Sequence, residues 1–319
     1  MKKIAIQLFG HLRSYKDTYI SFNKNLLEPL KKEGYEIDVF LHSWTETDTS
    51  EQSWHNINGD TRGRNTSNDD ITCVRKFYKP KKFKLEKQLL VDNFELREKF
   101  MNLPRQYSAI INSAYTKFRV NELRLQYEKE NNIHYDYIIQ TRPDILFNNE
   151  FGIDKFLNTY KTYGFEVPKN SVFTSCVPFR RGPIESDIFL CSIDLILFSV
   201  PEVMNKINNL YNSIISKELS EEWVRENLYS LEILWLMYLK YLNIDLVRLK
   251  YFQFEDYDIV RDIKEYSKIP QFKDASILKQ EHKKTIKLKK IQREILKLFP
   301  YFMVKKFIDK INNEIYKEF

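Results

Sequence analysis

KKIAIQLFGHLRSY, residues 2–15, opens the chain with an apolar run of strand length that Gly10 closes. An amphipathic pattern from Tyr15 to Lys32 predicts a helix, and the apolar run YEIDVFLHSW predicts a second strand at residues 35–44. Strand, helix and strand in succession form a βαβ unit, which implies parallel strands and a right-handed crossover. We therefore expect an α/β fold with an open, twisted, mostly parallel sheet and a Rossmann-like N-terminal half.

A third apolar run, YDYIIQTRPDILF, predicts a strand from Tyr135 to Thr141 with polar residues at its far end. In an open α/β sheet, ligands gather at the carboxyl ends of the strands. Arg142 and Asp144 lie at such an end and project to the same side of an extended segment, while Pro143 between them stiffens the backbone. They offer one guanidinium and one carboxylate to a single ligand.

A diphosphate suits this pair, because a guanidinium binds phosphate oxygens in bidentate fashion and a carboxylate can hold a bridging divalent ion. At the end of the first strand, Gly10 permits close backbone approach and Arg13 can reach the same phosphates. The sequence thus predicts a diphosphate site with Asp144 as metal ligand. The alternative is a structural salt bridge between Arg142 and Asp144.

The rest of the chain alternates polar loops, helices and short apolar runs. A polar, turn-rich stretch after the second strand predicts a mobile loop at residues 45–70. The further expected elements are a helix over about 95–132 interrupted near Pro104, a short helix near 153–161, a strand near Ser171, a polar turn at 180–186, an apolar run at 187–200, helices over about 201–217 and 221–242, and a late strand, IDLVRLKYF.

Composition indicates an ordinary globular chain: 319 residues, 43% of them hydrophobic, can bury a substantial core. Its three cysteines show no CxxC spacing, and the histidines are scattered, so no zinc pattern exists. The start MKKIAIQLFG lacks the apolar stretch of a secretory signal, and no segment is apolar enough to span a membrane. We expect a cytoplasmic protein.

The basic character of the chain is concentrated in residues 283–319, which hold eleven Lys and Arg against four Asp and Glu. This excess equals the net charge of +7 of the whole chain. Helical spacing on both sides of Pro300 predicts two amphipathic helices, which either pack on the body or bind an anionic membrane surface. A basic stripe also fits phosphate backbones, but no nucleic-acid module accompanies it, so we predict no nucleic-acid partner.

Four stretches in order, IAIQLFGHLRSY, DVFLHSW, YEKENNIHYDYIIQTRPDILF and DIFLCSIDLILFSVPEVM, resemble bacterial capsule and lipopolysaccharide glycosyltransferases of the GT-A fold. The similarity spans roughly residues 1–250, and the strand ending in RPD is its most specific part. The resemblance implies a nucleotide-sugar-binding catalytic domain at 1–255 and a basic, helical extension at 256–319. It implies transfer of a sugar from a nucleotide-sugar donor to a hydroxyl of a glycan or lipid-linked glycan.

In GT-A enzymes the first strand and its loop hold the nucleotide, and a later DxD motif binds a divalent ion and the sugar diphosphate. By this resemblance, Asp144 matches the last carboxylate of the motif, and Arg142 stands where its first Asp would be. In one alternative, Asp144 holds Mn²⁺ or Mg²⁺ together with water and the diphosphate. In the other, Arg142 supplies part of the positive charge that the metal would provide, and no metal is needed. The enzyme would work at the inner face of the cell membrane.

An inverting transfer also needs a general base, for which Asp187 and Glu232 are candidates. Asp187 follows the polar turn, and its alternative role is to anchor that turn. Glu232 lies in an apolar helix, and its alternative role is to form a structural ion pair. His11 and His42 each close an apolar strand, so both can face the nucleotide, and Trp44 can stack on its base. A purely structural role is the commoner one for histidines in such positions.

Two other functions stay open. A sugar-phosphate or nucleotidyl transferase would use the same strand ends and the same diphosphate-binding groups. A non-catalytic membrane-surface assembly protein could be built on a degenerate version of the fold. The products of donor turnover separate the two enzymes, and residues 283–319 would be essential to the assembly protein.

Overall fold

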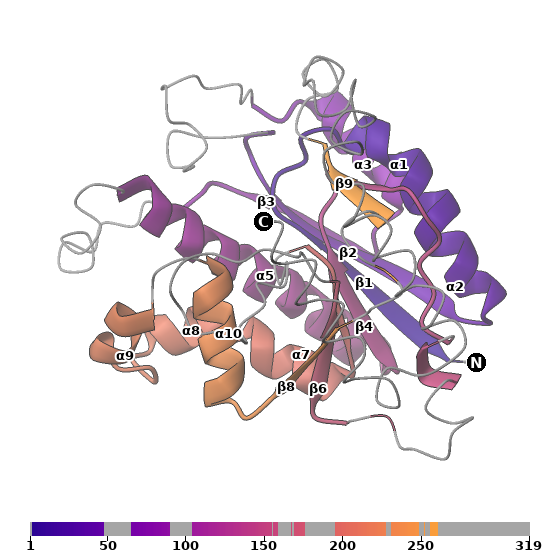
Figure 1. The fold of residues 1–319 in the computed structure, drawn as a ribbon. Helices are drawn as coiled ribbons and strands as arrows, with labels where there is room; N and C mark the ends of the chain where they lie inside the picture. Colours follow the sequence, from indigo (N-terminus) through magenta and orange to yellow (C-terminus); the bar gives the residue numbers. More distant parts are fainter. Residues whose placement is uncertain are drawn as a thin grey trace, which may run out of the picture.

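Seven strands of the described residues form one sheet, with the order β3-β2-β1-β4-β7-β6-β8 (Figure 1). The computed structural model describes residues 2–47, 65–89, 104–154, 156–158, 167, 169–175, 195–227, 231–248, 252 and 256–260, with the backbone alone at 104–107 and 248. The strands of the sheet are β1 (Lys3–Phe9), β2 (Glu36–Trp44), β3 (Lys82–Glu86), β4 (Tyr137–Thr141), β6 (Ser171–Thr174), β7 (Leu197–Ser199) and β8 (Asp245–Arg248).

The sheet is mostly parallel, as the sequence predicts. β1 pairs in parallel with both β2 and β4, and β3 continues this half in parallel with β2. β7 runs antiparallel to β4 and to β6, and β6 pairs in parallel with β8. Six strands therefore share one direction, and β7 is the exception.

Helices cover both faces of the sheet (Figure 1). α1 and α3 lie on one side, and α5, α7, α8 and α10 lie on the other. The helices are α1 (Tyr15–Phe22), a π-helical turn (Asn23–Leu27), α2 (Glu28–Lys32), α3 (Asn68–Tyr78), α5 (Pro104–Asn131), α7 (Pro201–Asn208), α8 (Leu210–Ile215), α9 (Glu221–Asn227) and α10 (Leu231–Tyr241). No helix in these residues is both long and apolar enough to cross a membrane.

The alternation of side chains along β1 explains the two layers. Ile4, Ile6 and Leu8 are buried in the cluster beneath α1, whereas Ala5 and Phe9 belong to the cluster beneath α5. A strand that is apolar on both faces must be covered on both, and each large side chain buried in this way contributes about 1.5–3 kcal/mol. The continuous apolar run in the sequence thus produces a central strand.

The helices expected over 15–32, 201–217 and 221–242 form in the described residues, with interruptions that the sequence pattern does not predict. The helix expected over Tyr15–Lys32 passes through a π-helical turn just before Pro29, whose nitrogen has no hydrogen to donate to a helical hydrogen bond. The helix expected over 201–217 is divided into α7 and α8 at Asn209. Within the helix expected over 221–242, the structure describes α9 as far as Asn227 and α10 from Leu231.

α3 and β3 are absent from the sequence-based expectation. The loop expected at 45–70 ends earlier, because Ser67 begins α3 with a capping box: its side chain accepts from the Asp70 backbone, and Asp70 accepts from the Ser67 backbone. Residues 48–64 of that loop, the turn at 180–186 and residues 187–194 lie outside the described residues. The strands at Ser171 and Asp245 are confirmed, and Asp154 with residues 156–158 is helical.

A second, two-stranded sheet pairs residues on either side of position 255. β5 (Ile145–Phe147) pairs antiparallel with β9 (Tyr257–Ile259), so residues directly after the expected boundary at 255 belong to the body. The backbone N–H of Val260 also donates to the carbonyl of Asp144 at 2.8 Å. The basic segment at 283–319 and its expected helices lie outside the described residues.

Candidate functional site

The order of the strands creates a switch point between β1 and β4. From β1 the chain moves to β2 and β3 on one side, and β4 then pairs with β1 on the other side. Ligands of open α/β sheets bind in the crevice outside the carboxyl ends of the strands at such a point. Gly10 and Arg13 follow β1, and Arg142 and Asp144 follow β4, so the predicted residues lie at the carboxyl ends of the two strands that form this switch point.

Asp144 lies between two guanidinium groups. Nε of Arg142 donates to its Oδ1 at 2.8 Å, and Nη2 of Arg142 donates to its Oδ2 at 2.6 Å. Nη1 of Arg13 donates to the same Oδ2, also at 2.6 Å. The side chain of Asp144 is 0% exposed, and the side chains of Arg13 and Arg142 are 7% and 14% exposed. The salt bridge between Arg142 and Asp144, given above as the alternative to a ligand site, is present, and it includes Arg13 as a second arginine.

The backbone around Asp144 is held by two distant parts of the chain, and the backbone of Arg13 by a third. The carbonyl of Pro143 accepts a 2.5 Å hydrogen bond from the Thr18 hydroxyl of α1, and the carbonyl of Asp144 accepts from Val260. Arg13 has a positive φ of 45°, and its N–H donates to the carbonyl of Thr47 at 2.6 Å. The two arginines and the carboxylate are therefore fixed by the fold before any ligand is present.

The electrostatic balance at Asp144 favours the ionised form. Burial alone would raise the pKa of this carboxyl, but the charges and hydrogen bonds of Arg142 and Arg13 outweigh burial and hold the pKa below its ordinary value. One carboxylate against two guanidiniums leaves a net positive charge at the switch point, which is suited to an anion.

The same geometry does not fit a divalent ion at Asp144. Both carboxylate oxygens accept from guanidinium N–H groups, and two positive charges lie against them. Mg²⁺ and Mn²⁺ need several oxygen ligands, and no group of three or more His, Cys, Asp or Glu side chains that could hold a metal occurs among the residues the structure describes. We therefore assign no chemical step to a metal on Asp144.

His42 and Trp44 lie inside the protein. His42 is 0% exposed, with Nδ1 2.8 Å from Oγ1 of Thr116 and Nε2 2.9 Å from Oε2 of Glu86. Trp44 is 2% exposed and stacks on Tyr115 with the ring centroids 6.0 Å apart. Neither ring presents a face or a nitrogen to a nucleotide in this arrangement, so we leave both out of the proposed ligand contacts. His11 is partly exposed, and its ring contacts the Glu46 carbonyl and the Gln88 amide.

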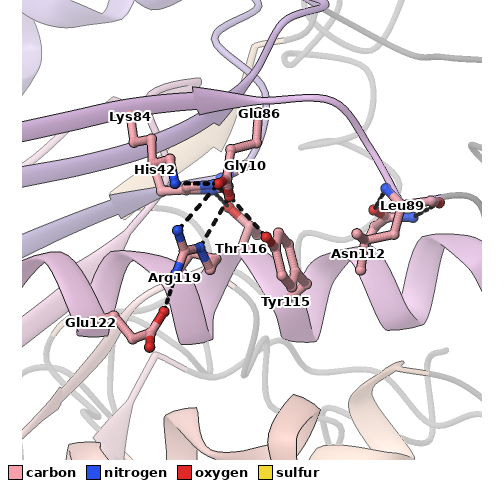
Figure 2. Close-up of polar contacts among 10 residues, drawn as sticks. All are labelled: Gly10, His42, Lys84, Glu86, Leu89, Asn112, Tyr115, Thr116, Arg119 and Glu122. Carbon is pink, nitrogen blue, oxygen red and sulfur yellow. Dashed lines mark hydrogen bonds and ion pairs between the residues drawn. The ribbon is translucent and has the colours of Figure 1, made fainter. Parts of the chain in front are cut away.

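Glu86, the last residue of β3, is the centre of a polar cluster that the sequence analysis missed (Figure 2). Besides His42, its carboxylate accepts from Tyr115 at 2.9 Å, from Nε of Arg119 at 3.1 Å and from Lys84 at 2.5 Å. The hydrogen bond from His42 does most to hold the pKa of Glu86 below its usual value, against partial burial. Three residues after Glu86, Leu89 pairs through both its N–H and its carbonyl with the side-chain amide of Asn112 on α5.

Compared with known proteins, the chain matches no family model and shows no significant match to a curated protein.

Glu232 lies at the same edge of the sheet as the arginine pair. β8 runs parallel to β1, so it begins at the amino edge, and α10 leads into it after a three-residue connection. The first turn of α10, with Glu232, is therefore at the opposite, carboxyl edge, and the side chain of Glu232 is partly exposed. Asp187, the other candidate base, is outside the described residues.

Lys117 of α5 brings a further cation to this edge. Its side chain is 0% exposed, and its ammonium lies 4.9 Å from the ring centroid of Phe9 and 4.5 Å from that of Trp235. A signal for it exists in the sequence, because Ile110, Ala114, Lys117, Asn121 and Arg124 recur at helical spacing and all are buried. Charged residues inside an apolar stripe indicate a buried polar network.

Proposed function

We propose that the protein is a glycosyltransferase that transfers a sugar from a nucleotide-sugar donor to an acceptor hydroxyl in the synthesis of capsule or lipopolysaccharide. One observation carries the proposal: two arginines share a buried carboxylate at the switch point of an α/β sheet. That place and that charge suit the diphosphate of a nucleotide sugar. The resemblance of the RPD strand to GT-A glycosyltransferases supports the same substrate class.

Arg13 and Arg142 have the chemistry that the leaving group requires. When the bond between the sugar and the diphosphate breaks, negative charge grows on the diphosphate oxygens and must be stabilised in place. The planar, permanently charged guanidinium matches the geometry of phosphate oxygens, and both groups are held next to each other by their hydrogen bonds to Asp144. Because Asp144 fixes both groups, little reorganisation is needed as the charge develops.

The acceptor side of the reaction is assigned to Glu232. If the transfer inverts the anomeric centre, a carboxylate must take the proton of the acceptor hydroxyl. Glu232 lies at the carboxyl edge of the sheet and is partly exposed, as a base that meets substrate must be. Asp187 is the alternative base from the sequence. We propose a glycan or lipid-linked glycan as acceptor.

The cellular setting is part of the proposal. A lipid-linked acceptor would be met at the inner face of the cell membrane, with the enzyme in the cytoplasm and peripheral to the bilayer. The basic residues of segment 283–319 would contribute attraction to anionic lipid. Sedimentation with anionic vesicles, with and without that segment, tests this part separately.

The test of the function is calorimetric titration with a panel of nucleoside diphosphates and nucleotide sugars, in chelator and with Mn²⁺. We expect one nucleotide to bind and Arg142→Ala to weaken it by about tenfold or more, since a hydrogen bond to a charged group contributes about 1.5–3 kcal/mol. Lys31→Ala is the matched control, because Lys31 is exposed on α2 and its loss changes the net charge equally.

Product analysis then separates the classes of function. Release of a nucleoside diphosphate with a glycosylated acceptor supports the glycosyltransferase. Release of pyrophosphate would replace it with a nucleotidyl transferase. Binding of no nucleotide at all would overturn the enzymatic proposal and favour the assembly protein.

A further inference from the structure

Residues 10–13, the loop between β1 and α1, begin with a hydrogen bond to helix α5. Gly10 has a φ of +91°, which other residues rarely adopt, and its N–H donates to Oγ1 of Thr116 at 3.2 Å (Figure 2). Arg13 ends the same loop and reaches Asp144. The position of Thr116 therefore helps to set where the loop leaves the sheet.

The hydrogen atoms along this contact can be assigned. Glu86 is ionised and only accepts, so the hydrogen between it and His42 is on Nε2 of the histidine. Burial lowers the pKa of His42 despite the nearby carboxylate, so its ring is neutral and Nδ1 carries no hydrogen. Nδ1 then accepts from the hydroxyl of Thr116, whose oxygen accepts from Gly10.

The result is a one-directional chain of donors: Gly10 to Thr116, Thr116 to His42, and His42 to Glu86. Hydrogen bonds aligned in this way polarise and strengthen one another. The chain ends on a carboxylate that Tyr115 and Arg119 hold in place. Thr116 is on the same helix as Tyr115 and Arg119, so one rigid element supports both ends of the chain.

We propose that Thr116, His42 and Glu86 are positioning residues for the diphosphate site. They hold Gly10, and through it the loop that carries Arg13, in the binding arrangement before the ligand arrives. This inference rests on the proposed function. A loop that must become ordered on binding costs affinity, and a preordered loop avoids that cost.

Thr116→Val tests this series of hydrogen bonds, because valine has nearly the shape of threonine but lacks its hydroxyl group. Calorimetry with inorganic pyrophosphate should show about tenfold weaker binding to the folded variant. Hydrogen exchange at residues 9–13 should be faster than in the wild type. Thr116→Ser restores the oxygen and should restore both. Ser199→Ala, which removes a buried hydroxyl bonded to Ser171 near the amino end of β4, should change neither.

The outcomes separate this inference from the proposed function. Wild-type binding with equal binding by Thr116→Val would overturn the positioning role and leave the diphosphate site intact. Failure of the wild type to bind pyrophosphate or any nucleoside diphosphate would overturn both. Should Thr116→Val not fold, Glu86→Gln replaces it: it removes the charge that ends the chain, and unchanged affinity in that variant would also overturn the inference.

Discussion

Arg13 and Asp144 are 131 residues apart in the sequence, yet Nη1 of Arg13 donates to Oδ2 of Asp144 at 2.6 Å. Removing the carboxylate leaves two guanidiniums close together and largely buried. We expect Asp144→Ala to lower the free energy of unfolding by about 3 kcal/mol, since breaking a buried ion pair strands the remaining charges. Urea unfolding measures this.

Anions should partly reverse that loss. In Asp144→Ala, phosphate or pyrophosphate can take the place of the carboxylate, and a ligand that binds only the folded state raises its stability with concentration. Thermal unfolding of the variant should therefore shift upward with added pyrophosphate by more than that of the wild type. Stability of Asp144→Ala equal to that of the wild type would contradict the central role of the ion pair.

Removal of divalent metal should leave pyrophosphate binding unchanged. The arginine pair supplies the positive charge at Asp144, and both oxygens of that carboxylate are engaged. Calorimetry in chelator and in Mn²⁺ should give the same dissociation constant within about twofold. A tenfold gain with Mn²⁺ that Asp144→Ala abolishes would show that the carboxylate exchanges its arginines for the ion.

The sequence predicts the strand ends of this site but not all of its contacts. The runs before Gly10 and Arg142 have the continuous apolar character of strands buried on both faces, and this is enough to place their carboxyl ends together. Which donor reaches Asp144 depends on side-chain directions across elements far apart in sequence. Local sequence pattern carries no information on that choice, so the sequence predicts Arg13 at the phosphates, whereas the structure places its guanidinium on the carboxylate of Asp144.

The same limit applies to His42, Glu86 and α3. The strand that contains His42 is evident from the sequence, but the environment of its ring depends on Glu86 from β3, a short edge strand of mixed polarity. The start of α3 does have a local signal, Ser67 followed three residues later by Asp70, hidden at the end of a polar stretch.

Acid should destabilise the protein through His42. Burial holds the pKa of His42 in the folded state below 6.5. As the pH falls from about 6.5, the unfolded chain therefore binds a proton on His42 that the folded state does not bind. Stability present above pH 6.5 is therefore lost on acidification, by at most about 1.4 kcal/mol per pH unit for one proton. Urea unfolding between pH 7 and 5 should show a smaller decrease in His42→Gln, and equal decreases would be evidence against a neutral, buried His42.

Ser67→Ala should weaken the start of α3. The hydroxyl accepts from the backbone N–H of Asp70, and loss of such a cap costs about 1 kcal/mol. Denaturant unfolding measures the difference, with Ser216→Ala, an exposed serine at the end of α8, as the control. A loss in the control as large as that in Ser67→Ala would show that the cap is not its cause.

Glu232→Gln separates catalysis from donor binding. As the proposed base, Glu232 takes a proton from the acceptor and makes no contact with the diphosphate, so the variant should bind the nucleotide as the wild type does. Its kcat should fall by about 10²–10⁴, the contribution of a positioned general base. Glu222→Gln, an exposed acid on α9, serves as the matched control. A kcat for Glu232→Gln close to that of the control would remove Glu232 from the mechanism. Asp187 would then be the remaining candidate for the base, because Arg13 and Arg142 cannot accept a proton at neutral pH.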